Sequence, residues 1–243
     1  MRKAILDVGS NSVLLLVADL VAGGIRSVLD LAQVTALGAG TAKTKLIGET
    51  GMADTLAAIR TFWTAAQDSG AESVVAGGTM ALRIATNAED FFQKARNQGT
   101  PVQLVSAEQE SEWGLQCALF DPRFAQAQRV VTIDPGGHST EVCFADRDGA
   151  ETKNRFRHSF PVGALGIRDE YFESDAADPS AIFRASLAID QCLAAFPVPQ
   201  LEPIAGTEVV VFGATATNLV SIRERLTTWD PEAVHGQRLT SEE

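Results

Sequence analysis

One pattern, a strand, an acidic turn and a returning strand, occurs twice in the chain and constrains its fold more than any other feature. In 130–146, residues with strong strand preference run into Asp134, a Pro-Gly-Gly turn follows, and an apolar strand returns from Glu141. In 4–19, the same arrangement surrounds Asp7 and a Gly-Ser-Asn-Ser turn. Each stretch is typical of a β-hairpin. A chain that repeats this hairpin is predicted to contain two similar lobes.

The residues at the hairpin tips suit an anionic ligand accompanied by a cation. Backbone amides of a tight turn, with hydroxyls such as those of Ser139 and Thr140, can surround an anionic oxygen. Carboxylates are the oxygen ligands that divalent cations such as magnesium prefer. A purely structural interpretation of the turns is disfavoured, because two such tips coincide with a segment that carries Arg83 near the start of a predicted helix.

Helices and strands are predicted to alternate in the rest of the chain. Apolar residues at helical spacing predict a helix over 52–69, and Asn87 is expected to cap a later one. A continuous apolar strand over 208–212 ends in a turn of small residues that contains Gly213 and Thr215. Such a turn lets a nucleotide or phosphate approach backbone amides closely. The alternation indicates an α/β protein.

Composition excludes several classes of protein. The formal net charge of −11 argues against a broad basic surface that follows a nucleic acid. The chain has no run of 18 apolar residues, which a membrane span would need. The first twenty residues imitate a signal peptide, but Asp7 and Asn11 interrupt their apolar run. The three cysteines have neither disulfide-framework nor zinc-ligand spacing. We therefore expect a cytoplasmic protein that binds neither nucleic acid nor membrane.

Seven segments, in order along nearly the whole chain, carry a more specific signal. They are DVGSNS (7–12), TMALR (79–83), SAEQES (106–111), DPGGHSTE (134–141), FPVGA (160–164), GAT (213–215) and WDPEAVHG (229–236). Together they resemble the motifs of the exopolyphosphatase and guanosine-pentaphosphate phosphohydrolase family, which has the actin-like ATPase fold. Each motif alone is weak evidence for the family, whereas seven motifs in the family's order are specific evidence for it.

The resemblance implies an α/β fold with two actin-like, ribonuclease H-like lobes and an active site in the cleft between them. The expected division places the N-terminal lobe at 1–117 and the C-terminal lobe at 118–243. In the family, further helices and strands follow the motif at 229–236, whereas few residues follow it here. We therefore expect an incomplete second lobe, with an unpaired sheet edge or an exposed core face.

The same resemblance assigns roles to individual residues. Glu110 is the implied general base for a water molecule, and Asp134 and Glu141 complete the catalytic set. Asp7, Asp134 and Glu141 would hold Mg²⁺. Phosphoryl transfer needs such a cation, an oriented nucleophile and in-line placement rather than covalent work by the protein. The implied phosphate-binding residues are Ser10, Asn11, Ser12, Arg83, Gly136, Gly137, Ser139, Thr140, Gly213 and Thr215.

The chain departs from the family pattern at several of these motifs. His138 stands in place of a third glycine and adds a side chain where close backbone approach is needed. Pro135 replaces an aliphatic residue and removes an amide donor. Gln109 replaces the first of two adjacent glutamates, while Glu110 is retained. Charged side chains that are common in the family are missing at Leu14, Ala36 and Ala39.

Three functions are compatible with these residues. The first is magnesium-dependent hydrolysis of terminal phosphoanhydride bonds in inorganic polyphosphate or guanosine pentaphosphate. The second is a catalytically weak protein of the same fold that binds polyphosphate or an alarmone, which the changes at His138 and Pro135 favour. The third is an ATP-using relative, such as a sugar or acetate kinase, whose glycine signature would be richer than that at 213–215. The resemblance also allows a homodimer.

Overall fold

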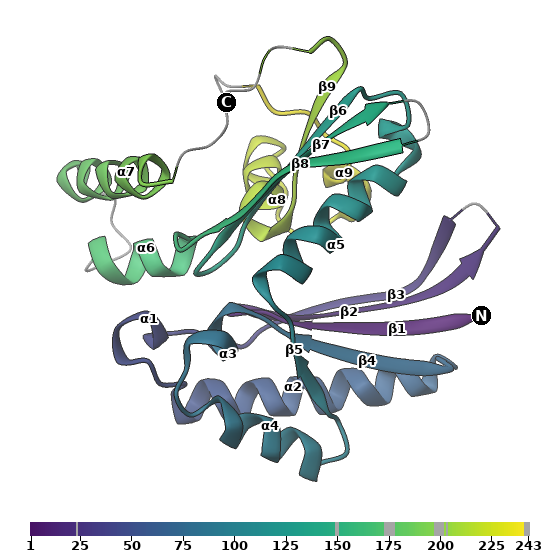
Figure 1. Ribbon diagram of the computed structural model, residues 1–243. Helices are drawn as coiled ribbons and strands as arrows, with labels where there is room; N and C mark the ends of the chain where they lie inside the picture. Colours follow the sequence, from purple (N-terminus) through teal and green to yellow (C-terminus); the bar gives the residue numbers. More distant parts are fainter. Residues whose placement is uncertain (23, 149–150, 173–177, 197–201, 203, 241–243) are drawn as a thin grey trace.

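The computed structural model describes residues 1–22, 24–148, 151–172, 178–196, 202 and 204–240. It contains two β-sheets, one above the other in Figure 1, and helix α5 (Ala107–Phe120) runs between them. No helix within the described ranges is both long and apolar enough to cross a membrane.

The first sheet has five strands in the order β3-β2-β1-β4-β5. Strands β1, β2 and β3 are antiparallel neighbours, whereas β4 and β5 continue the sheet in parallel with β1. The first predicted hairpin is thereby confirmed as β1–β2. The strands are β1 (Arg2–Val8), β2 (Ser12–Val21), β3 (Gly24–Val34), β4 (Ser73–Gly78) and β5 (Val102–Leu104).

Helices cover the lower face of this sheet in Figure 1 and form a single hydrophobic core with it. Alternate residues of β1 and β2 point into this core, where Leu6 and Leu15 are completely buried. The predicted helix over 52–69 is confirmed as α2, and it buries Ile59 against the sheet. The helices are α1 (Thr41–Thr44), α2 (Glu49–Asp68), α3 (Met80–Ile84) and α4 (Ala88–Asn97).

The second sheet repeats the strand order of the first. Its order is β8-β7-β6-β9, with antiparallel pairing from β6 to β8 and β9 parallel to β6. The second predicted hairpin is therefore confirmed as β6–β7. Among the described residues no strand pairs with the outer edge of β9, so the expected unpaired edge is present there. The strands are β6 (Arg129–Pro135), β7 (Thr140–Asp148), β8 (Glu151–Phe160) and β9 (Thr207–Val211).

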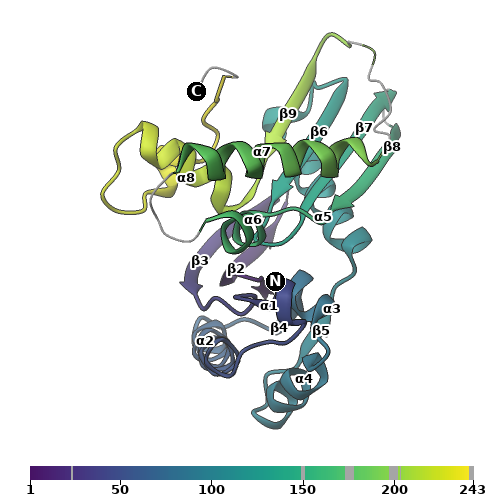
Figure 2. The same ribbon diagram turned by 90° about the vertical axis from the view of Figure 1, so that its left-hand side faces the viewer.

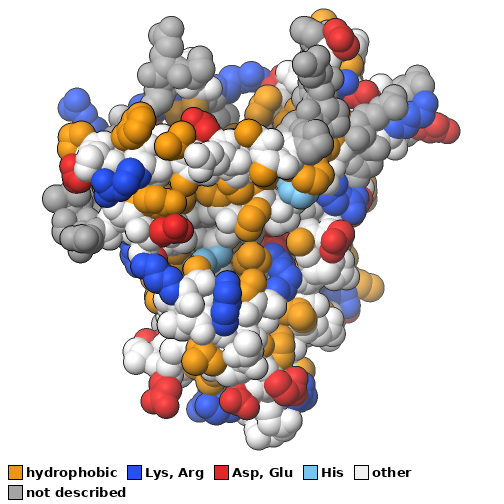
Figure 3. All heavy atoms as spheres, turned by 60° about the vertical axis from the view of Figure 1, so that its left-hand side comes forward, with side chains coloured by type: hydrophobic (Ala, Val, Ile, Leu, Met, Phe, Trp, Pro, Cys, Tyr) orange, Lys and Arg blue, Asp and Glu red, His pale blue; other side chains and the backbone are white. Residues whose placement is uncertain are grey.

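The core of the second sheet is divided. Helix α5 packs on β6, β7 and β8, whereas α7 packs mainly on α6 and lies to one side of the sheet in Figure 1. Figure 2 shows α7 from the side that faces away from α5. One small cluster contains Leu115 and Val130, and another contains Phe144 and Phe156. Figure 3 shows apolar side chains at the surface on the side of α7. The remaining helices are η1 (Pro122–Phe124), α6 (Ala164–Tyr171), α7 (Pro179–Ala194), α8 (Gly213–Arg223) and α9 (Pro231–Val234).

The described elements therefore form two halves, named here by their sheets: the first half contains β1 to β5, and the second contains β6 to β9. The expected division after residue 117 falls within α5, near its C-terminal end. This exact boundary stays a prediction.

Candidate active site

The two hairpin tips, far apart in the sequence, are in contact in the structure. A Cβ atom built on Gly137, in the second tip, would lie 3.2 Å from the Cβ atom of Ser10, in the first tip. Both turns are closed in the same way. The amide of Gly9 donates to the carbonyl of Ser12 at 2.9 Å, and the equivalent bond closes the second turn from Gly136 to Ser139 at 2.8 Å. The two turns that the sequence predicts to bind phosphate are therefore adjacent, and their binding of phosphate stays a prediction.

Four carboxylates gather around these tips. Asp7 lies on β1 next to the first tip, and Asp134 and Glu141 are cross-strand partners on β6 and β7. Glu110 lies in the first turn of α5. Electrostatic interactions connect Asp7 with Glu110 and Asp134, and connect Glu110 with both members of the facing pair. The sequence-predicted acidic residues are therefore brought together.

Crowding by protein atoms makes it costly to ionise three of these groups. Desolvation, with repulsion from Glu141 and Asp134, raises the pKa of Glu110 to about 7, although Arg83 opposes the shift. Desolvation also raises the pKa of Asp7 and that of Asp134 to about 6, and neighbouring carboxylates add to both shifts. The side chain of Asp7 is exposed to solvent on one side. We therefore attribute its raised pKa to the protein atoms and carboxylates packed around its other side. A bound cation would relieve this repulsion.

Arg83 brings positive charge to the acidic residues. Its Nη1 atom donates to Glu110 Oε2 at 2.7 Å and to the carbonyl oxygen of Val105 at 2.9 Å. Its Nη2 atom is buried and has no hydrogen-bond partner in the described part of the chain. A buried donor left unpaired costs about 1–3 kcal/mol. The phosphate-binding role of Arg83 stays a prediction, and the unpaired Nη2 atom is the donor that it would use.

Two residues that are predicted to bind phosphate donate their hydroxyl hydrogen bonds to backbone carbonyls of the protein itself. Thr140 Oγ1 donates to the carbonyl of Val162 at 2.7 Å, and Thr215 Oγ1 donates to the carbonyl of Pro135 at 2.8 Å. Both side chains therefore brace the second tip. A phosphate could still reach their backbone amides or accept bonds from other residues of the turn.

Glycine is required where β9 passes into α8. Gly213 has a φ of 76°, and a Cβ atom there would lie 2.9 Å from Asp134 Oδ1. A side chain at this position would be strained and would crowd the carboxylate. The turn at 213–215 thus begins beside Asp134 of the acidic pair.

His138 lies inside the site region rather than at its surface. The residue is only 5% exposed. Neither nitrogen of its imidazole ring has a hydrogen-bond partner among the described residues. Burial lowers the pKa of His138, although Asp169 opposes this shift. The imidazole is therefore expected to be neutral at pH 7.

Comparison with known proteins identifies the family. The model of the Ppx/GppA phosphatase family matches residues 16–243. The chain belongs to the Ppx/GppA phosphatase family. This confirms the resemblance inferred from the seven motifs and shows that the protein is a phosphohydrolase.

Solved structures of other Ppx/GppA proteins confirm the two-lobed actin-like fold. The Aquifex aeolicus PPX-GPPA enzyme is 27% identical, with a TM-score of 0.73 over 98% of this chain and 76% of that chain. An exopolyphosphatase from Cytophaga hutchinsonii is 17% identical, with a TM-score of 0.70 over 96% of this chain and 73% of that chain. An exopolyphosphatase-like protein is 20% identical, with a TM-score of 0.82 over 93% of this chain and 69% of that chain. The last two comparisons show the fold alone.

The donor set of this Ppx/GppA phosphatase fits a magnesium ion that is only partly enclosed by protein. In the described residues, no three His, Cys, Asp or Glu side chains are arranged as a complete metal-binding group. Magnesium, however, is usually held by one or two carboxylates together with waters and substrate phosphates. The facing pair Asp134 and Glu141, with Asp7 nearby, matches that requirement.

Sequence reasoning missed two structural supports of this Ppx/GppA site. Ser159 Oγ donates to Glu141 Oε1 at 2.7 Å, and only the register of β7 with β8 places these residues opposite each other. Ser106 and Gln109 form a reciprocal capping box that fixes the start of α5 just before Glu110. The Ser-x-x-Gln spacing was a visible signal for this cap.

Proposed function

We propose that this phosphatase uses Mg²⁺ to hydrolyse terminal phosphoanhydride bonds of inorganic polyphosphate or guanosine pentaphosphate. Water would attack in line and release phosphate. The observation that carries the proposal is the placement of Glu110, which contacts Arg83 and faces Asp134 and Glu141. A carboxylate whose pKa is about 7 is well matched to general-base catalysis near neutral pH.

Each group in the site has a defined part in this reaction. Glu110 would orient the attacking water and accept its proton, while the Nη2 atom of Arg83 would donate to a phosphate oxygen. The turn containing Ser10 and the turn containing Ser139 would hold the phosphate from the two halves of the molecule. The protein would thus supply placement and electrostatic stabilisation, which are the main requirements of phosphoryl transfer.

Asp134 and Glu141, with Asp7 beside them, would hold the magnesium ion. The repulsion among these carboxylates and the raised pKa values of Asp7 and Asp134 support this assignment, because a divalent cation would stabilise the ionised forms. When bound, the ion would neutralise charge on the phosphate oxygens.

The direct test measures phosphate release from long-chain polyphosphate and from guanosine pentaphosphate, with magnesium or with a chelator. Glu110→Gln keeps the shape of the side chain but removes the base, so activity should fall about 10²- to 10⁴-fold. Glu108→Gln, on the exposed side of the same helical turn, is the matched control and should retain activity.

The substrate that is hydrolysed faster would identify the substrate class. Full activity in Glu110→Gln, or activity that persists in chelator, would contradict the proposed mechanism. Tight binding of either polyanion without phosphate release would instead favour the catalytically weak binding protein.

A further inference from the structure

The first tip is braced by the segment that follows β3. The carbonyl of Asn11 accepts hydrogen bonds from the amides of Thr35 and Ala36, both at 2.9 Å. Two residues further on, the amide of Gly38 donates to the carbonyl of Ser10 at 2.7 Å. The position of the first tip is therefore tied to the position of residues 35–38.

The second tip is braced by the first turn of α6. The amide of Ala164 donates to the carbonyl of Gly136 at 3.0 Å, and the amide of Leu165 donates to that of Gly137 at 2.8 Å. These bonds use amides at the start of the helix that have no partner within it. The second tip is therefore tied to α6, just as the first is tied to residues 35–38.

The ring of His138 is wedged between these two braces. A Cβ atom built on Gly38 would lie 2.7 Å from His138 Cε1 and 3.0 Å from Nδ1. On the other side, a Cβ atom built on Gly166, in α6, would lie 3.8 Å from Cδ2. One side chain of the second half thus fills the space between the supports of both tips.

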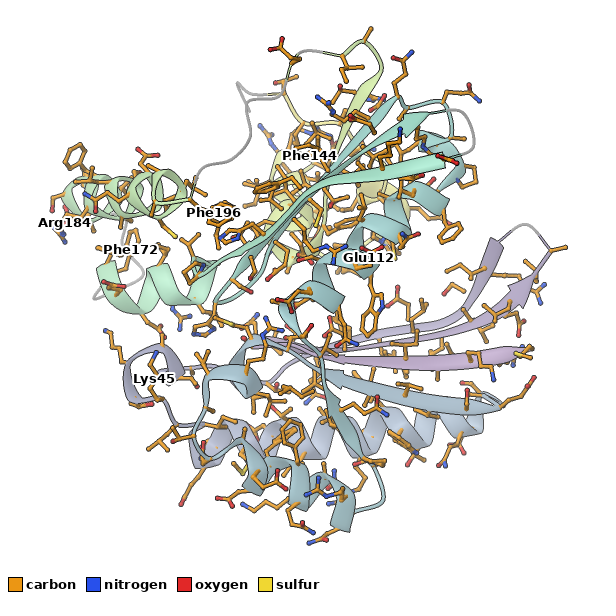
Figure 4. All side chains as sticks on the ribbon, in the orientation of Figure 1. Lys45, Glu112, Phe144, Phe172, Arg184 and Phe196 are labelled. Carbon is orange, nitrogen blue, oxygen red and sulfur yellow. The ribbon has the colours of Figure 1, made fainter. Side chains whose placement is uncertain are left out.

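Polar contacts reinforce the same junction. Asp169, on α6, accepts a hydrogen bond from the amide of Gly40 to its Oδ2 atom at 3.3 Å, and its carbonyl oxygen accepts one from Lys43 Nζ. Figures 1 and 2 both show α1 next to α6, and Figure 4 shows Lys45 on the α1 side of this junction. Two separate kinds of contact therefore join the halves beside the site.

We propose that His138 and Asp169 form a clasp that fixes the spacing of the two tips, and that His138 is a positioning residue of the phosphatase. The proposal rests on the proposed function, because the tips are the parts that would hold phosphate. The ring acts by packing against Gly38 and not by contact with substrate. A misplacement of about 1 Å in such a site can reduce the rate about 10²-fold.

Kinetics distinguish packing from substrate contact. His138→Ala removes the ring and should lower kcat at least about tenfold, with a smaller change in KM, because bound phosphate is held in the wrong place. His138→Leu fills much of the same volume without ring nitrogens and should restore most of kcat. If Leu is as damaging as Ala, the packing role is overturned and the imidazole contacts the substrate.

A distance measurement tests the clasp without relying on activity. Spin labels at Gln93 on α4 and Asn218 on α8 would report the separation of the halves, in a chain whose Cys117 and Cys192 are replaced by alanine. His138→Ala and Asp169→Ala should each broaden or shift the distance distribution. The neighbouring variant Glu170→Gln is the control and should leave it unchanged.

Unchanged distances in both clasp variants, with folding confirmed by thermal unfolding, would overturn the clasp. If the unsubstituted chain releases phosphate from neither substrate, the proposed function is contradicted, but the clasp is not. The two failures are therefore distinguishable.

Discussion

The two halves share a strand order but bury their helices to different extents. In the first half, α2 follows the third strand and buries Ile59 completely against the sheet. In the second half, α7 follows the third strand but leaves Phe183 69% exposed and Leu187 47% exposed. Figure 4 shows Phe196, beyond the end of α7, near the second sheet. One topology can therefore be built on a continuous core or on smaller clusters.

This contrast has a physical consequence for stability. Burial of apolar surface contributes about 25 cal/mol per Å². The single core of the first half should therefore supply more of the free energy of folding than the divided core of the second. The catalytic chemistry is shared by both halves, so activity and stability should respond differently to substitutions.

The largest expected effect comes from a matched pair of core substitutions. Ile59→Ala leaves a cavity in the closed core and should reduce the free energy of unfolding by about 2–5 kcal/mol. Leu187→Ala on α7 should cost less than about 1 kcal/mol, because the side chain is nearly half exposed. Urea unfolding of both variants measures the difference. Equal losses would show that α7 is packed as firmly as α2.

A second pair compares what each half contributes to the acidic residues. Arg83→Leu removes the partner of Glu110 and the unpaired Nη2 donor, so kcat/KM should fall about 10²-fold. Ser159→Ala removes one neutral donor to Glu141 and should cost about tenfold or less. Steady-state phosphate release tests the order. A larger loss of kcat/KM in Ser159→Ala than in Arg83→Leu would show that the second half contributes more to the function of the acidic residues.

The smallest effect is a dependence of stability on pH that both halves share. The folded-state pKa values of Asp7, Asp134 and Glu110 are raised to about 6, 6 and 7. The folded protein then binds more protons than the unfolded chain between about pH 4 and pH 7, so stability from these groups falls as pH rises through this window.

Thermal unfolding in chelator should therefore show a Tm that decreases by a few degrees from pH 5.5 to pH 8, whereas magnesium should raise Tm most at pH 8. Asp7→Asn removes one of the titrating groups and should flatten the chelator curve. A chelator curve that rises over this range would contradict the pKa assignments.

Patterns that are local in the sequence predicted most of the fold. The hairpins and α2 follow from strand preference, turn residues and helical spacing. The contact of the two tips was inferred from the family resemblance, because no local pattern relates them. Local rules failed at Asn87, which precedes α4 but makes no cap bond with its side chain. That side chain instead exchanges two hydrogen bonds with the backbone of Ile47, and these long-range partners override the local preference.

The candidate site was predictable in its residues and less so in their supports. Glu110, Asp134 and Glu141 carry motif signals, and the structure gathers them. Ser159 and Asp169 have no such signal, because their partners are set by strand register and by the packing of α6 against α1. The roles assigned to all these residues stay predictions.

Helix α5 begins at the acidic residues and packs along its length on the second sheet. Glu110, in the first turn of this helix, is therefore supported by the second sheet, although it precedes that sheet in the sequence. Arg83 and Asp7 belong to the first half. The ion pair between Glu110 and Arg83 thus bridges the two halves, so the charge balance around the base depends on both.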